Sequence, residues 1–475
     1  MKRLSPIDAA FLRMESTRTP MHVGCMLTFR LPENAPEDFF RTLVKRMRSE
    51  PFLPEPFNSR LEHTGRFALR PGWVEVDDLD MEYHVRHSAL PRPGGERELG
   101  VLVSRLHSHP LDLDRPLWEM HVIEGLEDNR FAFYFKAHHC AIDGMGAMIM
   151  TRQWLKTDPE DMSSLGVLTP KKDPRAKVTR RREQLRVALA IAIKKAGGVG
   201  ELATKLVDMS RGKDSMVRAS MDTPKSLFNV PVSQQRRLGT QRLELARFKA
   251  VADAKGVSVN DAILAVCGGA TRKYLLEQKA LPKTSLMASV PIGLERDEKG
   301  GNAVAGFVCP LGTDEANPVR RLQNIHAATK RAKADLQAMS RPALDNLALT
   351  GLAPLILGQM TGTLSKMPPI FNFVVSNVVL TKHKLYLMGA ELEAMYPMSF
   401  LFDGYALNVT VIGYGEHVAI GFIGSRDALP KLQSLAVYAG EALTELEQAV
   451  AQGKKSTPKK PAKRKTTTKR ASKKP

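Results

Sequence analysis

Two adjacent histidines followed by an Asp-Gly pair could perform acid–base chemistry in this chain. They are His138 and His139, with Asp143 and Gly144, in the segment 138–144, HHCAIDG. A neutral imidazole is the usual general base near neutral pH. It could take a proton from an alcohol, whose oxygen could then attack an activated acyl carbonyl such as a thioester without a covalent enzyme intermediate. Asp143 could accept a hydrogen bond from an imidazole N–H, or it could pair with an arginine or cap backbone N–H groups. Gly144 has no Cβ and so leaves room for close approach of a substrate or of another chain segment.

A strand and a helix must position these residues. Residues 131–137, FAFYFKA, predict a strand, and 118–123 predict a second one that forms a hairpin with it through a turn at 127–129. Because side chains alternate along a strand, His139 should continue the face of Phe131, Phe133 and Phe135, and His138 should point to the opposite side. The segment 145–154 predicts a helix whose methionines either line an acyl channel or belong to the core.

Other chemistry is also compatible with these residues. The histidines could be satisfied core residues beside an ordinary turn. Cys140 could be a nucleophile with His139 as its base, which would make the protein a thiol hydrolase or transferase. Neighbouring strand residues face opposite sides, however, and that argues against such a pair. His107 and His109 are two residues apart without an accompanying carboxylate or thiol cluster, so we expect no metal.

The motif resembles the HHxxxDG signature of the superfamily that includes chloramphenicol acetyltransferase and peptide-synthetase condensation domains. Further segments resemble one branch, the bacterial wax ester synthase/acyl-CoA:diacylglycerol acyltransferases. These segments are 4–11 (LSPIDAAF), 20–24 (PMHVG), 110–119 (PLDLDRPLWE), 260–261 (ND), 301–302 (GN) and 407–409 (LNV).

The resemblance implies an α/β fold with two chloramphenicol acetyltransferase-like domains, each a mixed sheet flanked by helices, and an active site between them. It implies transfer of a fatty acyl group from acyl-CoA to a long-chain alcohol or diacylglycerol in storage-lipid synthesis. His139 would be the general base, with His138 and Asp143 in the catalytic motif and Gly144 and Asn260 at the substrate. From its type alone, Asn260 would equally suit a helix N-terminus. Acyl-CoA is then a substrate, and we expect no cofactor.

Two positions depart from the family pattern. Superfamily members pair the motif aspartate with an arginine, but Glu295 precedes Arg296 where a positive residue is usual, which leaves the partner of Asp143 open. The family usually continues its Asn-Val pair with Pro-Gly-Pro, whereas the pair Asn377-Val378 is followed here by VLT. This difference could alter the substrate range.

The length of 475 residues and the charge distribution divide the chain. We expect an N-terminal acyltransferase domain at 1–155, a basic helical linker at 156–225, a C-terminal domain at 226–452 and a disordered basic tail at 453–475. Of the net charge of +20, residues 454–475 carry +11 and residues 171–195 carry +8, so the rest of the chain is nearly neutral.

The same composition bears on location and partners. There is no stretch of about 20 apolar residues and no secretory signal pattern, and the four cysteines are widely separated. We therefore expect a cytoplasmic protein without a transmembrane span, peripheral to an anionic membrane or lipid-body surface through its basic segments. The alternative from another class is a nucleic-acid-binding protein, and only the tail favours it.

Overall fold

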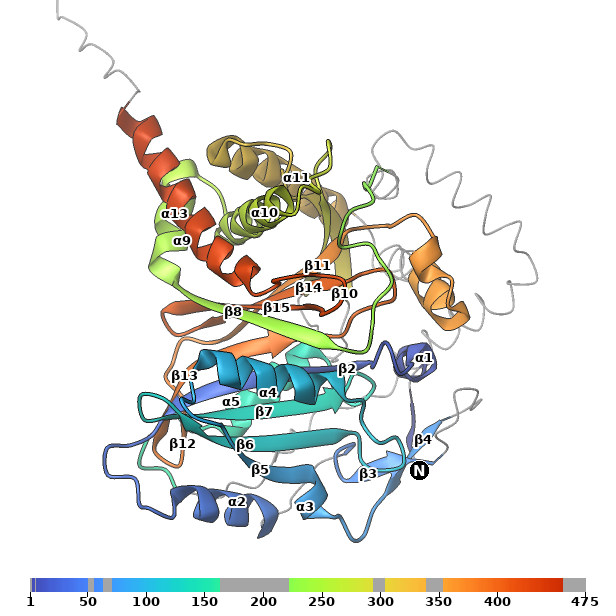
Figure 1. Cartoon of the computed structure of the whole chain (residues 1–475), viewed down its shortest axis with the longest axis vertical. Coiled ribbons are helices and arrows are strands. Elements are labelled where there is room, and N and C mark those ends of the chain that lie inside the picture. The colour runs from blue at the N-terminus through green and yellow to red at the C-terminus, as the bar shows by residue number, and fades with distance from the viewer. Residues whose placement is uncertain are drawn as a thin grey trace, which may run out of the picture.

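The protein is built on two six-stranded mixed sheets that lie one above the other (Figure 1). The computed structural model describes residues 2–4, 6–49, 55–62, 71–162, 222–293, 304–338 and 353–455. The predicted basic helix at 180–195, the tail beyond Lys455 and the Glu295–Arg296 pair lie outside these ranges.

The first sheet carries the histidine motif and contains both parallel and antiparallel pairs. Its strand order is β12-β13-β2-β7-β6-β5, formed by β2 (His22–Arg30), β5 (Val85–Ala89), β6 (Trp118–Leu126), β7 (Arg130–His138), β12 (Tyr386–Leu387) and β13 (Ala390–Met398).

The predicted hairpin is confirmed: β6 and β7 are antiparallel neighbours. Asp128 and Asn129 make the turn in the left-handed region, with φ of 62° and 55°, where these residue types are tolerated best. The alternating faces of β7 enter different cores. Phe131, Phe133 and Phe135 pack in one hydrophobic core, whereas Tyr134 belongs to a second, larger one, and both cores include residues from the two halves of the sequence.

Helices cover both faces of this sheet. In Figure 1, α4 lies between the two sheets, α2 lies on the outer face, and α1 lies beside the end of the sheet where the histidine motif is found. The helices are α1 (Pro6–Met14), α2 (Phe39–Ser49), α3 (Met81–His84), α4 (Glu96–Ser108) and α5 (Gly144–Trp154). A small additional sheet is formed by β1 (Lys2–Arg3), β3 (Ser59–Leu61) and β4 (Gly72–Glu75).

The second sheet has the order β10-β9-β11-β14-β15-β8, and its long helices lie on the face away from the first sheet (Figure 1). Its strands are β8 (Arg236–Glu244), β9 (Met287–Gly293), β10 (Val304–Pro310), β11 (Phe373–Thr381), β14 (Leu407–Tyr414) and β15 (His417–Ser425). The helices are α9 (Leu245–Lys255), α10 (Val259–Glu277), α11 (Pro318–Ala338), α13 (Ser434–Lys455), the short η2 (Leu364–Lys366) and a further helix at 353–361.

The two halves are interlocked. β13 comes from the second half of the sequence, yet it pairs with β2 in the first sheet. The shared core then continues between α4 and β8, whose Leu99, Val103, Leu238 and Leu243 belong to one buried cluster. The expected α/β fold of two mixed sheets flanked by helices is confirmed, but a single cut in the sequence does not separate the sheets.

None of the helices in the described ranges has both the length and the hydropathy needed to cross a bilayer.

Candidate active site

The histidine motif lies where β7 ends and α5 begins. β7 ends at His138, so His139 belongs to the following turn and strand alternation does not determine its direction. The backbone holds this turn at three points. The His138 N–H donates to Leu117 O at 3.0 Å, the His139 N–H to Met21 O at 2.9 Å, and the Ala141 N–H to His138 O at 2.9 Å.

His138 is the more deeply buried histidine, with no exposed surface. Its Nδ1 accepts the Cys140 backbone N–H at 3.1 Å, and its Nε2 donates to Glu15 Oε2 at 2.9 Å. The sequence predicted only that His138 would point away from His139, and it did not identify Glu15. Glu15 belongs to neither of the segments 4–11 and 20–24 that carried the family resemblance, so no motif indicated it.

His139 lies between two aromatic rings from different halves of the chain. Its ring stacks on Phe11 of α1 with centroids 4.1 Å apart, and meets the edge of Phe400 at 5.3 Å. Burial lowers the pKa of His139 to about 4, although the Asp143 carboxylate acts in the opposite direction. The imidazole is therefore neutral at physiological pH, as a general base must be.

Asp143 is the N-cap of α5. Its Oδ1 accepts the Gly146 N–H at 2.6 Å, and this bond provides a partner for an N–H that the helix itself cannot satisfy. The carboxylate is also close enough to His139 to oppose the fall in its pKa. Asp143 thus fixes the start of α5 and contributes charge beside the histidine.

Gly144 is exposed, and a Cβ at this position would meet no atom within 4 Å. The structure therefore leaves open space at the residue predicted to face substrate.

Asn260 lies in the first turn of α10, where its Oδ1 accepts the Asn377 Nδ2 at 3.2 Å. The N-cap is Ser258, which forms a capping box with Asp261. Asn260 thus joins α10 to β11, the strand against which α5 packs. This hydrogen bond links two elements of the second half, and the contact of Asn260 with substrate stays a prediction.

Cys140 and His107, which were considered for other chemistry, are both buried. Cys140 is buried in a small apolar cluster, and burial raises the pKa of its thiol well above the usual value, so it is not a thiolate. His107 Nδ1 is bonded to Tyr134 Oη at 2.8 Å. In the part of the chain that the structure describes, no group of three His, Cys, Asp or Glu side chains is arranged to hold a metal ion.

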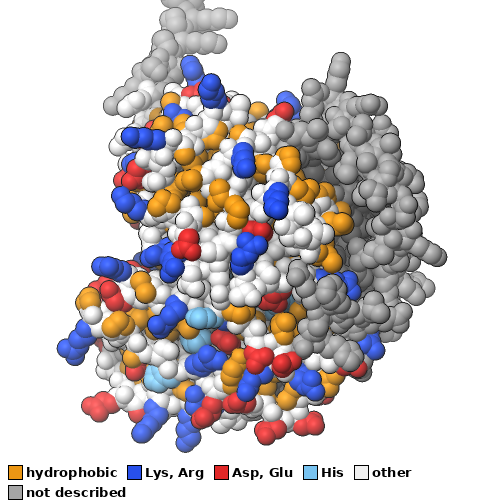
Figure 2. All heavy atoms as spheres, turned by 45° about the vertical axis from the view of Figure 1, so that its right-hand side comes forward, with side chains coloured by type: hydrophobic (Ala, Val, Ile, Leu, Met, Phe, Trp, Pro, Cys, Tyr) orange, Lys and Arg blue, Asp and Glu red, His pale blue; other side chains and the backbone are white. Residues whose placement is uncertain are grey.

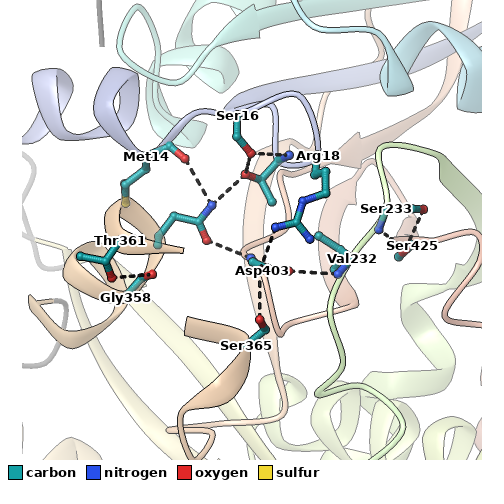
Figure 3. Close-up of polar contacts among 12 residues, drawn as sticks. Met14, Ser16, Arg18, Val232, Ser233, Gly358, Thr361, Ser365, Asp403 and Ser425 are labelled. Carbon is teal, nitrogen blue, oxygen red and sulfur yellow. Dashed lines mark hydrogen bonds and ion pairs between the residues drawn. The ribbon is translucent and has the colours of Figure 1, made fainter. Parts of the chain in front are cut away.

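A polar seam joins the two halves beside the motif (Figure 3). Gln359 Nε2 donates to Met14 O at 3.2 Å and to Thr19 Oγ1 at 2.7 Å, and its Oε1 accepts the Asp403 N–H at 2.9 Å. Asp403 in turn accepts from the Val232 N–H and from Ser365 Oγ, and pairs with Arg18 at 3.4 Å.

A cavity of about 340 Å³ opens at this seam, lined by Ser16, Thr17, Arg18, Thr19, Gln359, Met360, Thr361, Gly362 and Asp403. The loop that holds Asp403 also carries Phe400. The seam therefore fixes the segment of the second half that contacts His139.

Comparisons with known proteins agree with this geometry. Residues 4–263 match the wax ester synthase/diacylglycerol acyltransferase catalytic domain, and residues 300–447 match the C-terminal domain of the same proteins. A putative diacylglycerol O-acyltransferase of Mycobacterium tuberculosis is 50% identical over 454 residues, which cover 94% of this chain and 99% of the relative.

Solved structures show the same relationship. The wax ester synthase/diacylglycerol acyltransferase from Marinobacter aquaeolei VT8 is 35% identical, with a TM-score of 0.77 over 95% of this chain and 100% of that one. The first condensation domain of the calcium-dependent antibiotic synthetase, 15% identical, has a TM-score of 0.58 over 94% of this chain and 96% of that one, and so shares the fold. The chain is an acyltransferase and belongs to the wax ester synthase/diacylglycerol acyltransferase family.

Proposed function

We propose that the protein transfers a fatty acyl group from acyl-CoA to a long-chain alcohol, to diacylglycerol or to both, with His139 as the general base. The observation that carries this proposal is the neutral imidazole held between Phe11 and Phe400, at the junction of the two halves. A site at such a junction can receive two substrates, and apolar walls favour long acyl chains. The names of the relatives support the same substrates.

The proposed reaction needs one base and no covalent enzyme intermediate. The acceptor hydroxyl gives its proton to His139, and its oxygen attacks the thioester carbonyl. The tetrahedral intermediate then collapses, the carbon–sulfur bond breaks, and the imidazolium returns its proton to the departing CoA sulfur. The products are an ester and free CoA. The balance requires no cofactor, and acyl-CoA enters only as a substrate.

The test is a direct assay with labelled palmitoyl-CoA and either hexadecanol or a diacylglycerol. We expect labelled wax ester or triacylglycerol together with an equal amount of free thiol. Thiol release without ester in the presence of both acceptors would contradict the proposal and favour a hydrolase. Cys140→Ala serves as a control, because it should remain active if the cysteine is not the nucleophile.

We further propose a cytoplasmic enzyme that works at an anionic membrane or lipid-body surface during storage-lipid synthesis. The support is the +11 charge of residues 454–475 and the insolubility of the ester products. Each Lys or Arg near such a surface contributes about 1 kcal/mol, and salt screens this attraction.

Co-sedimentation with anionic and neutral vesicles, at low and high salt, tests this attachment in the full chain and in a variant ending at Lys455. We expect the shorter variant to bind anionic vesicles more weakly while retaining its activity on detergent-solubilised substrates. Binding that ignores both lipid charge and the deletion would contradict the electrostatic account. Tight tail-dependent binding to duplex DNA alone would instead assign the tail to nucleic acid.

A further inference from the structure

The C-terminal end of α1 contacts both histidines of the motif. Phe11 covers one face of the His139 ring at 4.1 Å, and Glu15, the residue after the helix ends, bonds the His138 ring at 2.9 Å. Both contacts join residues more than 120 positions apart in the sequence. The end of α1 and the residue that follows it therefore contact both histidine side chains of the motif.

The hydrogen bonds of His138 specify where its proton lies. A backbone N–H can only donate, so the bond from Cys140 requires an unprotonated Nδ1 on His138. The ring proton is then on Nε2, where it is donated to the Glu15 carboxylate. His138 is thus neutral and has both nitrogens occupied, so it has no free position with which to act on a substrate.

The chain on either side of Glu15 is held from the second half of the sequence. Gln359 bonds the carbonyl of Met14 on one side of Glu15 and the hydroxyl of Thr19 on the other (Figure 3). The Glu15 side chain is largely buried, with 10% of its surface exposed. With its flanking residues held in this way, the Glu15 carboxylate can impose one orientation on the His138 ring through Oε2, while its buried Oε1 has no hydrogen-bond partner among the described residues.

We infer that Glu15 is a positioning residue for the acyl transfer, which acts by holding His138 in the Nε2-protonated form so that the turn at Cys140 presents His139 to the substrates. This inference rests on the proposed function of His139. Without the carboxylate, the His138 ring is free to rotate or to move its proton to Nδ1, and the bond to Cys140 is lost. His139 then loses the fixed geometry that general-base catalysis requires.

Substitutions of Glu15 separate positioning from a general structural role. Glu15→Gln keeps an oxygen that can accept from His138 Nε2, and we expect kcat within about threefold of wild type. Glu15→Leu keeps a similar size without an acceptor, and we expect kcat to fall about 10- to 100-fold, the loss typical when a residue that orients a functional histidine is removed. The KM for acyl-CoA should change less than about twofold. Glu82→Leu, at an exposed glutamate on α3, is the matched control and should have no effect.

A double-mutant cycle with His138→Ala tests whether Glu15 acts through His138. We expect the loss caused by Glu15→Leu to disappear in the His138→Ala background, because the partner is already absent. Full additivity of the two losses, or wild-type kcat in Glu15→Leu, would overturn the inference.

A measurement independent of catalysis covers the case in which Glu15→Leu does not fold. Nitrogen-15 NMR of histidine-labelled protein reports which ring nitrogen carries the proton, and His138→Ala identifies the signal of His138. We expect protonated Nε2 in wild type and Glu15→Gln. A protonated Nδ1 in wild type would overturn the inference even if ester formation is intact. A protein with the expected tautomer but no ester product would contradict only the proposed function.

Discussion

The two halves of the molecule contain corresponding hairpins, but only the first leads into the histidine motif. In the first half β6 and β7 form a hairpin that leads into α5, and in the second half β14 and β15 form a hairpin that leads to α13 (Figure 1). β7 is flanked by β6 and β2, as β15 is flanked by β14 and β8. β7 ends at His138, with His139 in the turn that follows, whereas β15 ends at Ser425, whose hydroxyl accepts the backbone N–H of Ser233.

The buried polar residues of the two halves differ in the same way. All the fully buried histidines in the described ranges belong to the first half: His22, His84, His107, His121 and His138. In the second half the buried polar set contains amides, arginines and aspartates that bond backbone or one another, including Asn229, Arg236, Gln359, Asn372 and Asp403. The fully buried histidines thus lie in the first half, whereas the second half holds buried amides, arginines and aspartates in hydrogen bonds.

On the face drawn in Figure 2, basic side chains do not distinguish the two halves. In the view of Figure 2, lysines and arginines are spread over both halves and alternate with acidic residues on the lower one. The difference in buried polar residues can be tested at the two hairpins.

The largest effect should come from His139→Ala. We expect kcat to fall about 10²- to 10⁴-fold, the range attributed to a general base, while the protein stays folded. His417→Ala, in β15 of the corresponding hairpin, is the control and should leave kcat within about twofold. Steady-state assays and circular dichroism of both variants provide the measurement. Ester formation by His139→Ala at the wild-type rate would show that the two hairpins do not differ in chemistry. His138→Ala should lose less activity than His139→Ala.

Asp143 should show a smaller effect that divides between stability and rate. Asp143→Ala removes the cap of α5 and should cost about 1 kcal/mol of unfolding free energy, with a lower melting temperature and a several-fold loss of kcat. Asp143→Asn can still cap the helix and should retain more of both properties. Equal losses of kcat in the two variants, with unchanged melting temperatures, would assign Asp143 a direct chemical role instead.

The pH dependence of kcat/KM tests whether the His139 ring is as buried as its contacts with Phe11 and Phe400 imply. The pKa of His139 is lowered to about 4, so the ring stays neutral and able to accept a proton as pH falls through 6.5, the usual value for histidine. We expect a flat profile from about pH 8 to about pH 5.5 and a half-maximal value near pH 4. A half-maximal value near 6.5 would contradict the buried environment. Enzyme held at low pH and then assayed at pH 7 controls for unfolding.

The smallest effect should come from the amide pair in the second half. Asn377→Ala removes the donor to Asn260 Oδ1, and a partly buried bond of this kind contributes about 1 kcal/mol. We expect a slightly lower melting temperature and less than about a threefold change in kcat, because the pair links α10 to β11 without proton transfer. A loss approaching that of His139→Ala would mean that the second half takes part in the chemistry.

Local sequence patterns determined much of the scaffold. The alternation in 131–137 and the Asp-Asn turn predicted the β6–β7 hairpin, since strand faces and turn conformations depend on neighbouring residues. The residue type of Asn260 indicated a helix N-terminus, and the structure places the N-cap of α10 two residues earlier, at Ser258. The motif at 138–144, with the matching segments along the chain, was sufficient to predict the family.

Only the tertiary structure decided which residues surround the histidines. Glu15 meets His138 across 123 positions, Phe400 meets His139 from the other half, and β13 joins a sheet formed mainly by residues before 140. No local periodicity encodes such contacts, because they depend on how separate elements pack and on which buried polar groups must find partners. The sequence therefore determined the reactive groups and the elements that carry them. The packing of α1, the seam at Gln359 and the loop of Phe400 determined their proton positions and their burial.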